Sequence, residues 1–155
     1  MPSTRCSNAG WAHEPINHVL DAARGQKALH LCFGNYGGQS IQKGTWGKLM
    51  DYLNALKVDH IVMETAHRPP EELAVFKELR KDIGFGLGVV DIKKTEIESA
   101  DQIARSIERA DKVLGKGRVK YIHPDCGFWM LQRNMADGKM RALVAGRDLY
   151  EGRKT

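Results

Sequence analysis

The sequence contains no long hydrophobic run. Hydrophobic residues make up 42% of the 155 residues, too many for a disordered or collagen-like chain. Yet nowhere do about 18 apolar residues follow one another, the length that a membrane-spanning helix needs. Residues 1–10 also lack the apolar stretch of a secretory signal peptide. The sequence therefore predicts an irregular leader over residues 1–10 and one globular cytoplasmic domain over residues 11–155.

Cysteine is scarce, and its number is odd. Three cysteines in a chain without a secretory signal exclude a disulfide framework and leave metal ligation, a reactive thiol or simple burial. Cys6 lies in the irregular leader, whereas Cys32 and Cys126 lie at the ends of apolar runs. We therefore expect Cys32 and Cys126 to carry any chemistry.

Motifs for nucleic acids and nucleotides are also missing. Lysine and arginine exceed aspartate and glutamate by five, but the basic residues are dispersed and are not interleaved with aromatic residues. The glycine-rich segment 34–38 lacks the Gly-Lys-Ser/Thr ending of a P-loop and the third spaced glycine of a dinucleotide fingerprint. We interpret it as a tight loop, and we expect neither a nucleic acid nor a membrane as a partner.

What the sequence does contain is an alternation of short apolar runs and helix-period segments. The runs, rich in branched residues and followed by turn residues, predict buried strands over 27–33, 58–63, 85–91 and 118–123. Helices are predicted over about 11–23, 46–56, 70–83, 99–114 and 131–150. In the fourth of these helices, Ser99 and Gln102 form a capping box and Gly115 ends the helix.

This alternation predicts an α/β fold of parallel strands with right-handed crossovers. Two closures fit the pattern equally well: an open doubly wound sheet, or part of a (β/α)8 barrel. A complete barrel needs about 200 or more residues. Four units in 155 residues amount to half of one.

Four metal-binding side chains lie at the predicted strand ends. Parallel strands bring their carboxyl ends to one rim, where His30, Cys32, Glu64 and Cys126 would meet. One imidazole, two thiolates and a carboxylate suit tetrahedral zinc, with Glu64 as the ligand that departs when a substrate thiol binds. Each residue also has an ordinary structural role: burial for the cysteines, a hydrogen bond for the histidine, and pairing with Arg68 for the glutamate.

Four strings in this order resemble the catalytic domain of the cobalamin-independent methionine synthase family: HLCFGNYGG (30–38), MET (63–65), GVVDIKKTEIES (88–99) and HPDCGF (123–128). The resemblance covers the chain from about Pro15 onward. It implies the C-terminal half of a (β/α)8 barrel and the zinc-ligand roles of the four residues named above. It also implies transfer of a methyl group from a 5-methyltetrahydrofolate-type donor to a homocysteine thiolate held on zinc.

Some positions depart from the family pattern. Lys93 replaces the histidine of an Asp-Ile-His triplet, and Asn35 replaces an acidic residue that follows the first cysteine. The resemblance places Asp91 and Lys93 near the methyl donor, where Lys93 would protonate a leaving group or bind an anionic donor. Pairing with Asp91 is the structural alternative for Lys93. Phe128 and Trp129 are expected to wall the substrate pocket beside Asn35.

The first half of such a barrel has no counterpart in the sequence. An isolated half would expose two strand edges, so we expect a homo-oligomer or a complementary half-barrel chain as partner. Two other hypotheses remain open. The chain could be a non-catalytic zinc-binding fragment, or an open-sheet enzyme with Cys126 as the covalent nucleophile and His30 as its base.

Overall fold

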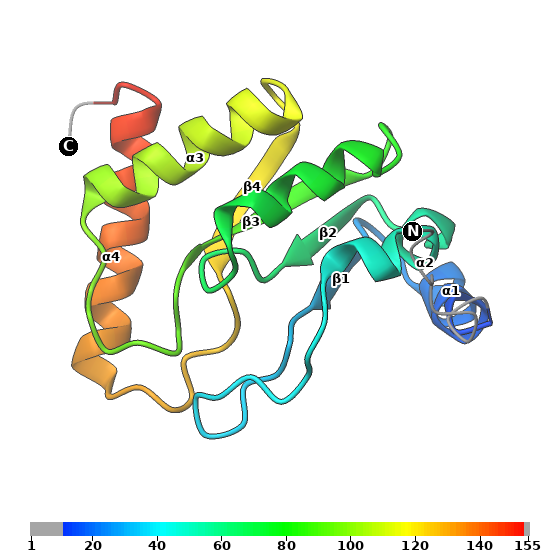
Figure 1. Cartoon of the computed structure of the whole chain (residues 1–155), viewed down its shortest axis with the longest axis horizontal. Coiled ribbons are helices and arrows are strands. Elements are labelled where there is room, and N and C mark those ends of the chain that lie inside the picture. The colour runs from blue at the N-terminus through cyan, green and yellow to red at the C-terminus, as the bar shows by residue number, and fades with distance from the viewer. Residues whose placement is uncertain (1–10, 154–155) are drawn as a thin grey trace.

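The computed structural model describes residues 11–153, so the leader predicted for residues 1–10 lies outside the described part of the chain. Helices and strands alternate through it (Figure 1). The elements are α1 (His13–Ala22), β1 (Ala28–Leu31), η1 (Trp46–Leu49), α2 (Met50–Ala55), β2 (His60–Met63), η2 (Pro70–Glu78), β3 (Gly84–Val90), α3 (Ala100–Leu114), β4 (Val119–Pro124) and α4 (Arg133–Tyr150).

The strands form one sheet in the order β1-β2-β3-β4, and every neighbouring pair is parallel. Ala28 pairs with His60, and His60 in turn pairs with Gly84, so the first three strands start level with one another. Each crossover passes through helical segments, as a parallel sheet requires. The predicted βα repeat is therefore confirmed, with strand boundaries shifted by at most two residues.

Two of the predicted helices are shorter or tighter than expected. Residues 46–56 form the 3₁₀ turn η1 followed by α2, and residues 70–83 form the 3₁₀ helix η2, which already ends at Glu78. Side chains from other elements explain the early end of η2. The Asn54 amide donates to the Glu78 carbonyl, and the Arg118 guanidinium donates to the carbonyls of Leu79 and Lys81. Tertiary hydrogen bonds thus replace the helical ones beyond Glu78.

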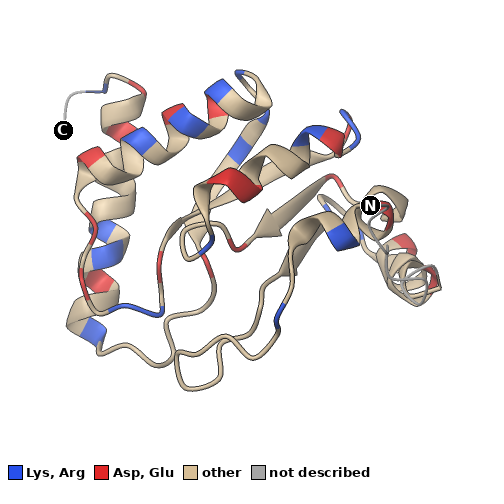
Figure 2. Ribbon diagram, in the orientation of Figure 1, with Lys and Arg blue, Asp and Glu red and all other residues tan. Residues whose placement is uncertain are grey.

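The predicted start and stop of α3 are confirmed. The Ser99 hydroxyl accepts from the Gln102 backbone amide, and the Gln102 side chain accepts from the Ser99 amide. Gly115 follows the helix with φ of 100°, a conformation that favours glycine. Charged residues of both signs lie along α3 and α4 (Figure 2).

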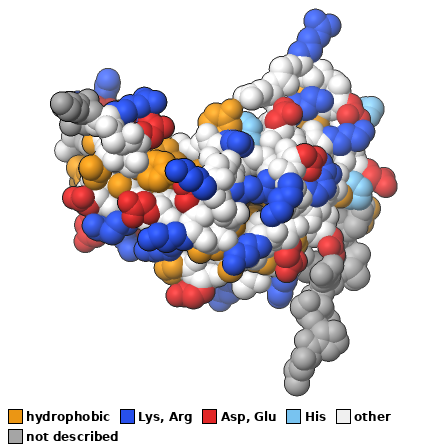
Figure 3. All heavy atoms as spheres, turned by 90° about the horizontal axis from the view of Figure 1, so that it is seen from above, with side chains coloured by type: hydrophobic (Ala, Val, Ile, Leu, Met, Phe, Trp, Pro, Cys, Tyr) orange, Lys and Arg blue, Asp and Glu red, His pale blue; other side chains and the backbone are white. Residues whose placement is uncertain are grey.

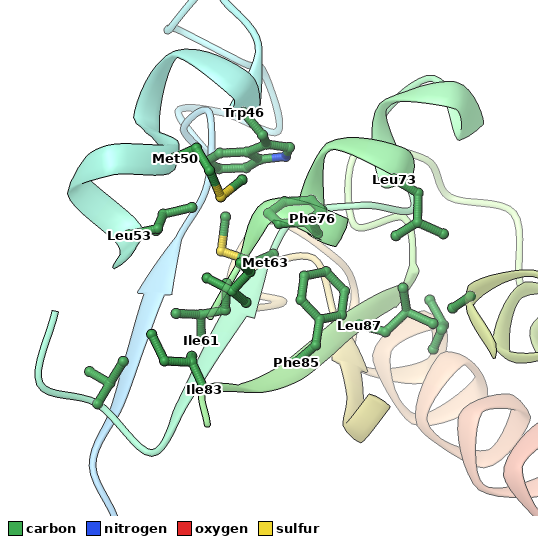
Figure 4. Packing of buried hydrophobic residues seen from close by; sticks show 14 of the residues in the cluster. Trp46, Met50, Leu53, Ile61, Met63, Leu73, Phe76, Ile83, Phe85 and Leu87 are labelled. Atoms are coloured by element: carbon green, nitrogen blue, oxygen red, sulfur yellow. The ribbon is translucent and has the colours of Figure 1, made fainter. Parts of the chain in front are cut away.

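The hydrophobic core lies between the sheet and the helices (Figure 4). Trp46, at the start of η1, is 2% exposed and packs on Phe33 and Phe76 with ring centroids 4.5 and 6.3 Å apart. Phe76 also packs on Phe85 of β3, at 4.7 Å. These aromatic contacts fix the helical layer on the outer face of the sheet.

The inner face of β3 carries glycine at alternate positions, Gly84, Gly86 and Gly88. A Cβ atom on Gly84 would lie 2.9 Å from the Lys120 side chain and 3.1 Å from that of His60. The glycines therefore let side chains of β2 and β4 meet across β3. At this end of the sheet the two edge strands approach each other, since the Tyr121 hydroxyl on β4 donates to the Gln26 side chain just before β1, at 3.0 Å.

Candidate metal centre

Three of the four expected ligands converge at the carboxyl ends of the strands. The donor atoms of His30, Cys32 and Cys126 all lie within 4.8 Å of one another. His30 is on β1, Cys32 directly follows it, and Cys126 follows β4, so the group joins the two edge strands of the sheet. The loops after β1 and β4 run to the same side of the molecule (Figure 1). There the Asn35 side chain donates to the Gly127 carbonyl at 3.0 Å.

Glu64, the fourth expected ligand, lies beside this group but does not belong to it. The residue directly follows β2 and is fully buried. One carboxylate oxygen, Oε2, accepts from the Phe33 amide at 3.0 Å and lies 3.2 Å from Lys93 Nζ. The other oxygen, Oε1, is buried without a hydrogen-bond partner among residues 11–153.

The surroundings of Cys32 and His30 favour the neutral forms of these two donors. Burial raises the pKa of the Cys32 thiol, and the neighbouring Cys126 and Glu64 raise it further. Partial desolvation lowers the pKa of His30, and so does the nearby His123. A neutral imidazole is ready to bind a metal, and a nearby dication would reverse the penalty on the thiolates. An imidazole, two thiols and a buried carboxylate oxygen without a partner fit zinc.

Asp125, next to Cys126, has a role that the sequence did not reveal. Its buried carboxylate accepts hydrogen bonds from the backbone amides of Thr65, Ala66 and His67, at 2.9, 2.9 and 2.7 Å. Burial nevertheless raises the pKa of Asp125 to about 6. The carboxylate thereby ties the segment after Glu64 to the loop that carries Cys126. Gly88 is the sequence feature connected with this role. Its lack of a side chain leaves room for Asp125, since a Cβ there would lie 2.0 Å from Asp125 Oδ1.

Asp91 and Lys93 follow β3 at the same rim, but they do not form an ion pair. Asp91 Oδ1 accepts from the Lys93 backbone amide, and Oδ2 lies 2.9 Å from His67 Nδ1 and 3.7 Å from Lys94 Nζ. The Lys93 side chain is 4% exposed and contacts Glu64 instead. Its ammonium therefore faces Glu64, one of the expected ligands.

Lys139, which the sequence analysis overlooked, holds the segment after β3. Its ammonium is fully buried under α4 and donates to the Asp91 carbonyl at 3.0 Å, to the Glu96 carbonyl and to both carboxylate oxygens of Glu98. Glu98 in turn accepts from the Asp91 amide at 2.9 Å. One sequence feature indicates this burial. Lys139 lies four residues before Leu143, so the two side chains share the buried face of α4.

The expected substrate-binding residues have different surroundings. Asn35 bridges the two loops through its amide, and its Oδ1 is buried without a partner in the described chain. Phe128 packs partly against the core, whereas Trp129 is 67% exposed. The glycine-rich segment forms a tight turn in which the Tyr36 and Gln39 backbones bond each other at 3.0 and 3.1 Å.

The contact between His67 and Asp91 predicts a pH dependence. Burial alone would raise the pKa of Asp91, but hydrogen bonds from His67 and from the Lys93 amide outweigh it, and the pKa is lowered. A lowered folded-state pKa stabilises the protein above about pH 4, and this stability is lost as the pH falls through that folded-state pKa. His67→Gln should therefore unfold at a higher pH during acid titration followed by circular dichroism. His18→Gln, at an exposed position of α1, is the control and should unfold at the same pH as the wild type. Equal unfolding midpoints for the wild type and both variants would contradict the stabilising contact between His67 and Asp91.

Comparisons with known proteins identify the family. Residues 9–147 match the model of the catalytic domain of cobalamin-independent synthases. The chain belongs to the cobalamin-independent methionine synthase family. Within it, the chain is 31% identical over 151 residues to a methionine synthase from Pyrococcus horikoshii and 32% identical over 136 residues to one from Thermococcus kodakarensis. These matches cover 93% and 87% of this chain but 41% and 37% of the relatives.

A solved structure supports the fold. A B12-independent methionine synthase from Shewanella sp. W3-18-1, in complex with selenomethionine, superposes with a TM-score of 0.72 at 22% identity. The match covers 92% of this chain and 43% of that one. The predicted half of a (β/α)8 barrel is thus confirmed, and this methionine synthase homologue spans about two fifths of the length of its relatives. Across residues 11–153 no helix has the length and apolarity needed to cross a membrane.

Proposed function

We propose that the chain supplies the zinc site of a cytoplasmic S-methyltransferase that methylates a small thiol. The observation that carries the proposal is the convergence of His30, Cys32 and Cys126 within 4.8 Å at the carboxyl ends of the strands. Membership of the methionine synthase family supports methyl transfer to homocysteine as the reaction. We further propose a 5-methyltetrahydrofolate-type molecule as the methyl donor.

In this proposal His30, Cys32, Glu64 and Cys126 are the zinc ligands. When bound, zinc supplies the Lewis acidity that lowers the pKa of a substrate thiol and presents the thiolate to an electrophilic methyl carbon. The unpartnered Oε1 of Glu64 is the oxygen available for ligation. Phe33 keeps the carboxylate near the site through its backbone amide.

Other side chains around the centre would bind and orient the substrates. The unpartnered Oδ1 of Asn35 can accept a hydrogen bond from the amino group of an amino-acid acceptor. Phe128 and Trp129 would wall the pocket, and Trp129 has the exposure that such a role needs. Asp91, held next to His67, would lie near the donor and take part in proton transfer to its leaving group. For Lys93, the contact with Glu64 favours a role on the metal side of the site.

Cys126→Ser tests the site directly. The wild-type chain should hold about one zinc per chain in elemental analysis, whereas the variant should bind zinc at least about 100-fold more weakly, because even partners of metal ligands contribute 10–100-fold. Cys6→Ser is the matched control, since Cys6 does not belong to any of the predicted strand ends. Stoichiometric zinc in Cys126→Ser would overturn the assignment. Methylation that survives chelation would instead favour Cys126 as a covalent nucleophile.

A second candidate is a zinc-binding subunit that needs a partner for catalysis. The chain spans about two fifths of its relatives, and β1 and β4 are the outer strands of the sheet. We propose that a second copy or a complementary half-barrel pairs with these strands. The mass in solution separates the candidates: a stable oligomer with methyltransferase activity supports the enzyme, and an inactive zinc-binding monomer supports the subunit.

A further inference from the structure

The buried contact between Lys93 and Glu64 has a consequence for the proposed zinc site. The two side chains are 4% and 0% exposed, and Lys93 Nζ lies 3.2 Å from Glu64 Oε2. Lys93 Nζ has no hydrogen bond among the described residues, and its ammonium contacts Glu64 through charge attraction. A buried cation and a buried anion that lie this close attract each other strongly.

The other carboxylate near Lys93 is already engaged. Asp91, two residues earlier, accepts from the Lys93 amide through Oδ1 and contacts His67 and Lys94 through Oδ2. The Lys93 ammonium therefore acts on Glu64. With 4% of its side chain exposed, Lys93 has little access to a phosphate- or carboxylate-bearing donor in solution.

The two oxygens of Glu64 differ in their partners. Oε2 has the Phe33 amide and Lys93, whereas Oε1 has no hydrogen bond within residues 11–153. Glu64 also lies outside the group formed by the other three donors. To complete that group, the carboxylate has to shift toward the metal, and the attraction of Lys93 opposes this shift.

We propose that Lys93 is a positioning residue that weakens Glu64 as a zinc ligand, so that a substrate thiolate can take its place. The inference rests on the proposed zinc site. The ammonium and the metal compete for the same carboxylate, whereas the imidazole and the two thiolates have no such competitor. Glu64 is thereby the ligand most easily exchanged. When Glu64 leaves the metal, its negative charge is paired with the Lys93 ammonium.

The test is zinc affinity measured by competition with a chelator. Lys93→Met should bind zinc at least about tenfold more tightly than the wild type, because Lys93 is the only ion-pair partner of Glu64 among residues 11–153. Removing any positive charge near a dication also strengthens binding, so the decisive comparison is made in a Glu64→Gln background. There, Lys93→Met should tighten zinc binding by clearly less than it does beside Glu64, because only the general charge effect remains. Lys93→Arg, which retains the charge, should resemble the wild type.

A second readout follows the exchange itself. In cobalt-loaded protein, the visible spectrum reports when homocysteine enters the metal's coordination shell, and Lys93→Met should need at least about tenfold more thiol than the wild type for the same change. If Lys93→Met fails to fold without metal, Lys93→Gln keeps a polar group there and serves in both experiments.

The outcomes separate the inference from the proposal on which it rests. A wild-type chain that binds no zinc overturns the proposed function itself. A wild-type chain that binds zinc, with equal affinity in Lys93→Met, overturns the role of Lys93 alone. If Lys93→Met tightens zinc binding equally with and without Glu64, the effect of Lys93 is only its general positive charge, and its role in weakening Glu64 is also overturned.

Discussion

Gly88→Ala should destabilise the protein by about 3–5 kcal/mol and abolish zinc binding. The new Cβ would lie 2.0 Å from Asp125 Oδ1 and 2.8 Å from the Met63 carbonyl oxygen. Asp125 would have to move, leaving the amides of Thr65, Ala66 and His67 without their acceptor. Urea unfolding measures the loss of stability, and elemental analysis measures the bound zinc.

Gly127→Ala is the matched control for this substitution. Gly127 directly follows Cys126, but a Cβ there would meet no atom within 4 Å, and its φ is not positive. The control should therefore unfold within about 0.5 kcal/mol of the wild type. A Gly88→Ala protein as stable as this control would show that Asp125 does not lie over β3 as described.

Lys139→Met should destabilise the protein by about 3–5 kcal/mol, the effect of removing one partner from a buried ion pair. The change leaves the Glu98 carboxylate, the Asp91 carbonyl and the Glu96 carbonyl without their common donor. Hydrogen exchange should then be faster in the segment after β3, which carries Asp91 and Lys93. Thermal unfolding and exchange mass spectrometry measure the two effects.

Arg141→Met provides the comparison within the same helix. Arg141 is exposed, two residues beyond Lys139 on α4, and its replacement should change stability by no more than about 0.5 kcal/mol. If both variants unfold alike, the buried ammonium is not what holds the segment after β3.

The sequence was sufficient to predict the sheet and the convergence of three of the four expected ligands, because both depend on alternation along the chain. Parallel strands place their carboxyl ends at one rim, so His30, Cys32 and Cys126 were predicted to meet from strand boundaries alone. This prediction needs the strand ends to within a few residues. β1 ends two residues before the predicted position, and β4 ends one residue after it.

What the sequence could not give are contacts that depend on the direction of a long side chain. Lys93 reaches Glu64 of the neighbouring strand end, although Asp91 is closer in sequence. Lys139 reaches the segment after β3 from a helix some 40 residues further along the chain. The early end of η2 likewise depends on Asn54 and Arg118, which belong to other parts of the chain.

The meeting of the two edge strands has a consequence for the order of folding. Contacts between the starts of β1 and β2 join residues 32 apart in sequence, whereas the contact between Asn35 and Gly127 closes a loop of 92. The longer closure loses about 1 kcal/mol more chain entropy, and it spans the two strands β2 and β3 that lie between β1 and β4. We therefore expect neighbouring strands to pair first and the rim to close last. A chain halted before β4 docks would lack Cys126 at the rim, so the proposed metal centre would be complete only in a completely folded chain.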